Sequence, residues 1–433
     1  MRIVVLDGSA ANDLPGQRTV NATLARLAAQ NHSVHTFTLR ELKIGNCAGD
    51  FFCWVRSPGQ CNIADDNRHI AAAIVAADLL LYLTPITFGG YSATLKKAVD
   101  HQIQNIAPFF TTRNGETHHT RRYARYADVL VIGWQPEPDP IAEAIFRHLV
   151  WRNSLNFYAQ TWHCEIVTGD PPEAALVSQI ESALAAIARR ESDPVPALPP
   201  LDSNLARRSP PRNALLLVGS PRTRKSTSYA LGEHLMQHLS ARGVQTETIH
   251  IYTSLSNPQK MHTLLTRIDS ADLMVLAFPI YVDSLPAPVI LLLERLAAHR
   301  AAHSVRGAGF AALANCGFPE VQHTANALAV CTGFARMTGF DWQGSLALGA
   351  GEGLVHGTPL NQLGGRTIPL RHALALAAES LAQGQPIPPA AQSLISKPFI
   401  PAWLYRLLGG IGWRQQARRW GVQALLHRTP YQP

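Results

Sequence analysis

Residues 214–231, ALLLVGSPRTRKSTSYAL, place hydroxyl and cationic side chains directly after an apolar run that is typical of a β-strand. A helix is expected to begin within this segment, and the backbone amides at a helix N-terminus favour an anion. Four hydroxyl groups can add hydrogen bonds to that anion, those of Ser220, Ser226, Thr227 and Ser228. The segment therefore predicts a phosphate-binding loop, with an ordinary capped helix as the alternative.

The same loop partly matches the nucleoside-triphosphate motif GxxxxGK[ST]. Gly219, Lys225 and Ser226 have the required spacing, but Arg224 stands where the motif needs its second glycine. The third strand expected in this half, near 273–277, ends without an aspartate to hold magnesium. These two departures count against an ATPase or a GTPase.

Short apolar runs alternate with helix-like stretches along the 433 residues, which predicts repeated βα units around parallel sheets. Strands are expected near 2–6, 34–39, 78–83, 129–132 and 164–167, and again near 214–218, 246–251, 273–277, 310–314 and 345–348. The proline-rich segment 191–212 between the two sets has the composition of a linker. We expect four parts: domain 1–190, linker 191–212, domain 213–384 and a tail, 385–433.

The two halves also resemble each other. ADLLLYLTPIT, from Ala77, aligns without gaps to ADLMVLAFPIY, from Ala271, and DGS at residues 7–9 corresponds to VGS at residues 218–220. An internal duplication is the simplest explanation.

Taken together, GSPRTRKSTS and PIYVDSLPAPVILLLE resemble the NAD(P)H-dependent FMN reductase family of the flavodoxin-like fold. In the first half, DGSAANDLPGQRTVNATL, TPITFGGYSATLKKAVD and a cysteine-containing loop are similar to the same family, including its iron-sulfur flavoprotein branch. The resemblance implies two tandem domains, each a five-stranded parallel sheet with helices on both faces. It also implies FMN at the carboxyl ends of the strands, NAD(P)H as electron donor, and a pseudo-dimer within the chain or a homodimer.

The resemblance assigns cofactor contacts residue by residue. In the second half it implies Ser220, Arg222, Ser226, Thr227 and Ser228 for the phosphate, and Pro279, Ile280, Tyr281, Val282, Asn315, Cys316 and Gly317 for the ring. In the first half it implies Ser9, Arg18, Thr19, Asn21 and Thr23, then Pro85, Ile86, Thr87, Phe88 and Gly89, then Trp134 and Gln135. The first loop of that half is longer and Asp7 brings a carboxylate near the phosphate, so we expect the second half to hold the tighter site.

The loop 44–66 contains Cys47, Cys53 and Cys61, with Asp50 where the second cysteine of CxxCxxC would stand. An iron-sulfur cluster needs a thiolate at each iron, so a structural loop over the flavin ring or a dimer interface is favoured over a cluster or zinc. The adjacent His118 and His119 and the other, mostly solitary histidines indicate no metal site.

Two further motifs are incomplete. GGYSATL, from Gly89, lacks the glycine after serine that a nucleophile elbow needs. GAGEGL, from Gly349, is not GxGxxG and is expected to form a turn.

The tail carries six basic residues and no acidic one, out of a net charge of +8. The globular part is therefore close to neutral, which argues against nucleic-acid binding. Three tryptophans and five arginines between residues 398 and 431 are compatible with contact at a membrane surface, but packing on the protein itself is favoured. Gly409, Gly410 and Gly412 are expected to interrupt a long helix.

We expect an enzyme without a dedicated catalytic side chain, because FMN supplies the hydride chemistry. The expected reaction is NAD(P)H-dependent reduction of a small-molecule acceptor, such as a quinone, a nitro or azo compound, or free flavin. An electron-transfer flavoprotein and a scaffold that has lost FMN are the alternatives. The apolar runs are shorter than the roughly 20 residues that span a bilayer, and the N-terminus reads as a strand, so a cytoplasmic location is expected.

Overall fold

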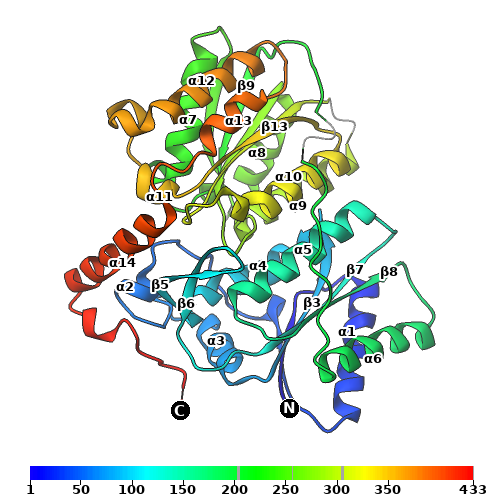
Figure 1. Cartoon of the computed structure of the whole chain (residues 1–433). Coiled ribbons are helices and arrows are strands. Elements are labelled where there is room, and N and C mark those ends of the chain that lie inside the picture. Colours follow the sequence, from blue (N-terminus) through cyan, green and yellow to red (C-terminus); the bar gives the residue numbers. More distant parts are fainter. Residues whose placement is uncertain (202–204, 256, 304–306, 433) are drawn as a thin grey trace. The chain divides into compact units, whose positions relative to one another are not determined.

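The computed structural model describes residues 1–201, 205–255, 257–303 and 307–432. The chain divides into two compact units, which Figure 1 shows in sequence colours. Unit 1 comprises Met1–Leu198 and Arg406–Pro433, and unit 2 comprises Pro199–Tyr405. The division falls inside the segment expected as a linker, and the tail is shared between the two units. That the two units pair as a pseudo-dimer within the chain stays a prediction.

Unit 1 contains a parallel sheet with strand order β2-β1-β3-β7-β8, to which the two-residue strand β4 adds an antiparallel pair. Its strands are β1 Arg2–Asp7, β2 Ser33–Thr38, β3 Leu79–Thr87, β4 Gly90–Tyr91, β5 Ile106–Arg113, β6 Glu116–Arg121, β7 Asp128–Gln135 and β8 Trp162–Thr168. Its helices are α1 Leu14–Ala29, α2 Phe52–Val55, α3 Asn67–Ala76, α4 Ala93–Asp100, α5 Pro140–Asn156 and α6 Glu173–Ala188. The five parallel strands are those expected from the sequence.

Unit 2 repeats this order as β10-β9-β11-β12-β13. Its strands are β9 Asn213–Val218, β10 Gln245–His250, β11 Leu273–Pro279, β12 Gly309–Asn315 and β13 Asp341–Leu348. Its helices are α7 Thr227–Ser240, α8 Pro258–Ser270, α9 Ala287–Ala302, α10 Ala325–Thr338, α11 Gly351–Leu354, α12 Ile368–Ala382 and α13 Pro389–Ile395, and α14 Ala402–Arg419 continues into unit 1. Numbered within each unit, the parallel strands run 2-1-3-4-5, the doubly wound order of flavodoxin-like proteins.

Both faces of each sheet carry helices because successive strand residues, which point to opposite faces, are apolar and buried. In unit 1, Leu81 packs with α1 and α6. The neighbouring Tyr82 points to the other face, where Tyr91 links it to Phe146 of α5. In unit 2, α7, α12 and α13 cover one face, while Phe310 meets Phe334 of α10 on the other. The predicted fold class is confirmed.

The hairpin β5–β6 was not expected from the sequence. Its turn is Asn114-Gly115, with φ of 50° and 80°, a dipeptide that is a strong hairpin signal. The hairpin and the cysteine loop form a small core with the C-terminal segment, in which Trp54 is 1% exposed and packs with Trp413 and Leu426. The cysteine loop therefore packs against the tail of its own unit.

Strand β8 anchors the start of the proline-rich segment. The Asp193 carboxylate accepts a hydrogen bond from the backbone N of Cys164 (2.8 Å) and lies 2.6 Å from Nδ1 of His163. Hydrogen bonds to Asp193 and Glu165 raise the pKa of His163 to about 9.

This raised pKa predicts a decline in stability at alkaline pH. Protonated His163 stabilises the folded state fully below the unfolded pKa of about 6.5, and this contribution is lost as the pH rises through about 9. Because the ring is partly exposed and screened, we expect a loss of about 1–2 kcal/mol in the free energy of unfolding across this range. Urea unfolding at several pH values should show the decline in the parent chain and not in His163→Gln, and an equal decline in both would refute the assignment.

Candidate functional site

The predicted phosphate loop of unit 2 connects the carboxyl end of β9 to α7. Ser226 caps the helix: its Oγ accepts from the backbone N of Tyr229 (3.1 Å) and donates to the carbonyl of Thr223 (2.6 Å). The hydroxyl residues lie together in this loop and none is more than 4% exposed, namely Ser220, Ser226, Thr227 and Ser228. The cationic Arg224 and Lys225 are exposed beside them.

Asn315, at the end of the fourth parallel strand, connects three of the predicted segments. Its side-chain amide donates to Ser228 Oγ (2.8 Å) and to the carbonyl of Phe278 (3.0 Å), and it is 5% exposed. The phosphate loop and the ends of β11 and β12 therefore meet at one edge of the sheet, as expected of a site at the carboxyl ends of the strands.

The segment after β11 makes a tight reversal. Tyr281 pairs with Ser284, and the two residues between them, Val282 and Asp283, have φ of 49° and 56°. The corresponding place in unit 1 has the same form, because Phe88 (54°) and Gly89 (86°) separate two residues of a paired hairpin. Positive φ is rare for residues other than glycine, above all for a β-branched residue such as Val282. The same backbone conformation at the matched positions Phe88 and Val282 therefore supports the internal duplication.

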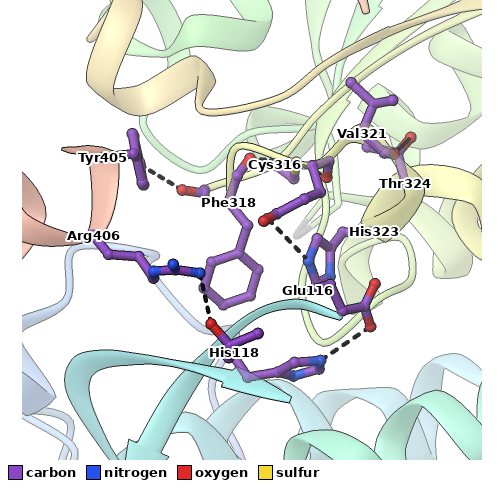
Figure 2. Close-up of polar contacts among 12 residues, drawn as sticks. Glu116, His118, Cys316, Phe318, Val321, His323, Thr324, Tyr405 and Arg406 are labelled. Carbon is purple, nitrogen blue, oxygen red and sulfur yellow. Dashed lines mark hydrogen bonds and ion pairs between the residues drawn. The ribbon is translucent and has the colours of Figure 1, made fainter. Parts of the chain in front are cut away.

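Two residues of unit 2 that were predicted to face the ring are already engaged by the chain. The carbonyl of Gly317 accepts a hydrogen bond from the Tyr405 hydroxyl (Figure 2). The Cys316 thiol is 3% exposed and lies 3.2 Å from the carbonyl of Phe318. Burial raises the pKa of Cys316 to about 12, so the thiol is neutral at physiological pH.

The glycine-rich segment after β13 packs on the phosphate loop. A Cβ added to Gly351 would lie 3.1 Å from Cγ2 of Thr227, and one added to Gly357 would lie 2.2 Å from the carbonyl of Lys225. Glu352, which the sequence analysis missed, pairs with Arg222 at 2.7 Å. The guanidinium predicted to bind phosphate thus already holds a carboxylate.

The donor set of unit 2 fits a phosphate. Hydroxyls, a helix N-terminus and a guanidinium are groups that bind phosphate in proteins, and unit 2 has four such hydroxyls beside Arg222. The carboxylate of Glu352 lies against this guanidinium, which shows that it can hold an anion. On this chemistry the residues of unit 2 fit FMN.

The corresponding loop of unit 1 is filled by its own ion pair. Asp7 is 3% exposed and accepts from the backbone N of Ser9 (2.9 Å). Arg40, also missed from the sequence, reaches both the Asp7 carboxylate and the Ser9 hydroxyl at 3.0 Å. Asp7 therefore points into this loop and neutralises Arg40. Unlike Glu352 of unit 2, whose side chain is 32% exposed, this carboxylate is buried within the loop.

The N-terminus of α1 is also closed. Asp13 caps the helix by accepting from the backbone N of Gly16 (3.0 Å), and it accepts from Nε1 of Trp134 (2.7 Å). A Cβ on Gly16 would lie 2.5 Å from the Trp134 ring. A carboxylate and an indole thus cover the helix end where a phosphate would bind, and with Asp7 nearby, unit 1 does not fit FMN.

The other residues suggested for unit 1 do not converge on a ligand. The hydroxyls of Thr19 and Thr23 donate to carbonyls within α1, Asn21 is exposed, and Arg18 pairs with Asp170 and Glu173. Farther along the chain, Phe88 is 6% exposed, and Gln135 donates to Glu143. A Cβ on Gly89 would lie 2.7 Å from Cβ of Ile145 in α5, so the turn at Phe88 and Gly89 lies close against that helix, while Pro85, Ile86 and Thr87 form the end of β3.

The cysteine loop encloses a small space. Cys47, Cys53 and Cys61 line a cavity of about 30 Å³ with Asp50 and His101, enough for about two water molecules. Burial raises the pKa of Cys47 to about 12 and that of Cys53 well above its usual value. Within the described ranges, no group of three or more His, Cys, Asp or Glu side chains is placed to hold a metal ion.

The adjacent histidines of β6 serve the packing of unit 1. His118 is 1% exposed, and its Nε2 lies 3.0 Å from the carboxylate of Glu116. Figure 2 shows this pair, and Glu116 also pairs with Arg152. The His119 ring packs on Trp54, with ring centroids 4.4 Å apart. These contacts place both rings in the packing of unit 1.

The strand order and the site at the carboxyl edge of β9, β11 and β12 define a flavodoxin-like protein. The chain belongs to the family described as NADPH-dependent FMN reductase, whose sequence profile matches residues 1–115 and 213–338. These are two matches in one chain, one in each unit, as a tandem duplication requires. The cofactor of this family is FMN, with NAD(P)H as electron donor. The resemblance inferred from the sequence is confirmed.

Solved structures with similarity to the chain include NAD(P)H:quinone oxidoreductase from Methanothermobacter marburgensis (15% identity, TM-score 0.35, 43% of this chain and 96% of that one). They also include an FMN-dependent NADH-azoreductase from Bacillus anthracis in complex with FMN (13%, 0.30, 39% and 99%). A flavodoxin from the domain Archaea is similar at 13% identity, with a TM-score of 0.28, covering 39% of this chain and 96% of that one. No curated protein sequence matches the chain. In the described part of the chain, no helix is long and apolar enough to cross a membrane.

Proposed function

We propose that the chain is an NAD(P)H-dependent FMN oxidoreductase that reduces a small-molecule acceptor, with its flavin in unit 2. The acceptor classes that suit this activity are quinones, nitro or azo compounds, and free flavin. The observation that carries the proposal is the cluster of buried hydroxyls at the N-terminus of α7, beside Arg222 and joined through Asn315 to the ends of β11 and β12. A cytoplasmic location is part of the proposal.

Each group in unit 2 has a proposed role. Ser220, Ser226, Thr227 and Ser228 donate hydrogen bonds to the phosphate, for which Ser226 and Thr227 give up their bonds to the carbonyls of Thr223 and Gly351. Arg222 balances the charge of the phosphate. The segments 279–282 and 315–317 border the isoalloxazine ring. FMN held by these residues would supply the hydride chemistry, so the chain itself supplies position and shielding from water. The neutral Cys316 thiol offers no nucleophile.

Anaerobic mixing of the FMN-loaded chain with NADPH and, separately, with NADH tests the proposed activity. Rapid bleaching of the flavin absorbance by either donor, and recovery when a quinone or an azo dye is added, are expected. Absence of bleaching with both donors would overturn the proposal. If dithionite then bleached the flavin and a protein partner reoxidised it, the alternative of an electron-transfer flavoprotein would gain support.

Removing the charge of Glu352 is expected to tighten FMN binding. The carboxylate competes with a phosphate for Arg222, and glutamine keeps the shape of the side chain without its charge. Because the pair is partly exposed, we expect about a 3–10-fold lower dissociation constant for Glu352→Gln in a flavin fluorescence titration. Glu379→Gln, at an exposed position of α12, is the matched control, with no change in affinity expected. Weaker FMN binding in Glu352→Gln would contradict this role.

A further inference from the structure

Helix α14 runs without a break through the glycines that were expected to interrupt it. The glycines instead allow close packing in unit 1: a Cβ on Gly409 would lie 2.4 Å from the ring of Phe110, and Gly410 is buried. Ala417 is fully buried, and Trp413 meets Phe51 and Trp54. One face of α14 is thus fixed to unit 1 by small and aromatic residues.

The opposite face of α14 is exposed, and it carries apolar side chains first and arginines after them. Leu407, Leu408 and Ile411 are 56%, 51% and 43% exposed, which is unusual for large apolar side chains on one helix. Arg414, Arg418 and Arg419 follow on the exposed face in the last two turns. Residues 407, 411, 414 and 418 have the three- and four-residue spacing that aligns side chains along one face. We call these six residues the α14 patch.

The charge of the patch is not neutralised by carboxylates. Residues 385–433 contain no aspartate or glutamate. Arg414 lies over the ring of Phe109 and donates to the carbonyl of Gly410, and Arg418 donates to Gln423. For the residues that the structure describes, no ion pair is recorded for Arg414, Arg418 or Arg419. Their guanidinium groups are therefore available to an external anionic surface.

We propose that the α14 patch rests on an anionic lipid membrane, with its leucine and isoleucine side chains in the interface and its arginines on the lipid phosphates. An interfacial helix combines apolar residues with arginines in this way. A second copy of the chain fits the patch less well, because any two-fold pairing of this face would place six arginines in one interface with no acidic residue from segment 385–433 to pair with them. The proposal does not depend on FMN, so its failure would leave the proposed oxidoreductase activity untouched.

Flotation of the full chain with lipid vesicles tests the patch. We expect binding to phosphatidylcholine vesicles that contain phosphatidylserine, little binding to phosphatidylcholine alone, and weakening by salt. Each arginine near such a surface contributes about a fivefold gain in partitioning, so the triple change Arg414→Gln, Arg418→Gln and Arg419→Gln should lower binding about 100-fold. The pair Leu407→Gln and Ile411→Gln should lower it at least about tenfold.

The matched control replaces two exposed apolar residues of other helices. Met337→Gln with Ile368→Gln, at 56% and 57% exposure, should leave vesicle binding unchanged. Because all these side chains are exposed, circular dichroism should show intact folding in every variant. Absence of binding to the phosphatidylserine vesicles, or equal loss in the control, would overturn the proposal. The proposal would also be overturned if the chain bound no vesicles and instead formed a concentration-dependent dimer that Leu407→Gln abolishes.

Discussion

Replacing Ser226 and Thr227 together by alanine is expected to lower the affinity for FMN at least about 100-fold. Hydrogen bonds to a charged group are worth about 1.5–3 kcal/mol each, and two of them therefore correspond to two or more decades in the dissociation constant. Both hydroxyls are buried at the N-terminus of α7 and belong to the only unit whose described residues fit a phosphate. Equilibrium dialysis with FMN measures the change.

Loss of the helix cap is the competing explanation, because Ser226 Oγ also accepts from the backbone of Tyr229. Removing such a cap costs about 1 kcal/mol in stability. Ser226→Asp separates the two effects: aspartate caps a helix as well as serine, but its charge repels the phosphate. In Ser226→Asp, the affinity for FMN should fall while the melting temperature of the chain is unchanged.

The matched change in unit 1 is Thr19→Ala with Asn21→Ala. Thr19 donates within α1 and Asn21 is exposed, so flavin content should not change. Loss of FMN with this pair and not with Ser226→Ala and Thr227→Ala would place the cofactor in unit 1.

Lys96→Met is expected to destabilise unit 1 by about 3–5 kcal/mol, because it leaves a buried carboxylate without its cation. Lys96 and Asp100 are 0% and 1% exposed and pair one turn apart in α4. Asp100 also lies near Cys47 and His101, so the pair supports the cysteine loop. Changing both partners, Lys96→Met with Asp100→Leu, should recover most of the stability.

Urea unfolding followed by tryptophan fluorescence measures this effect. Of the eight tryptophans, Trp342 and Trp403 belong to unit 2 and the other six to unit 1, so the signal reports mainly on unit 1. Lys97→Met changes the neighbouring, partly exposed lysine and should cost less than about 1 kcal/mol. Equal effects of the two changes would show that the buried pair has no special role.

The strands could be located from the sequence because their apolar runs are local signals. All ten expected parallel strands are present, and the phosphate loop of unit 2 lies where its serines and cations indicated. Two local signals were overlooked. Asn114-Gly115 forms the turn between β5 and β6, and Asp13 caps α1, with Pro15 in the first turn of that helix.

The remaining features depend on partners far apart in the chain. Arg40 reaches Asp7 across 33 residues, Trp134 reaches Asp13 across 121, and Glu352 reaches Arg222 across 130. No local pattern predicts such pairs, since each depends on how the sheet brings its loops together. The sequence could therefore rank the two sites by charge and loop length, but it could not reveal that unit 1 closes its own phosphate site.

The number of flavins per chain tests this account most directly. The full chain is saturated with FMN, freed of excess flavin by gel filtration and denatured, and the released FMN is compared with the protein concentration. We expect one FMN per chain, because the buried hydroxyls of unit 2 fit a phosphate while Asp7, Asp13 and Trp134 fill the corresponding place in unit 1. Two flavins per chain would contradict the closure of unit 1, and none would contradict the site at α7.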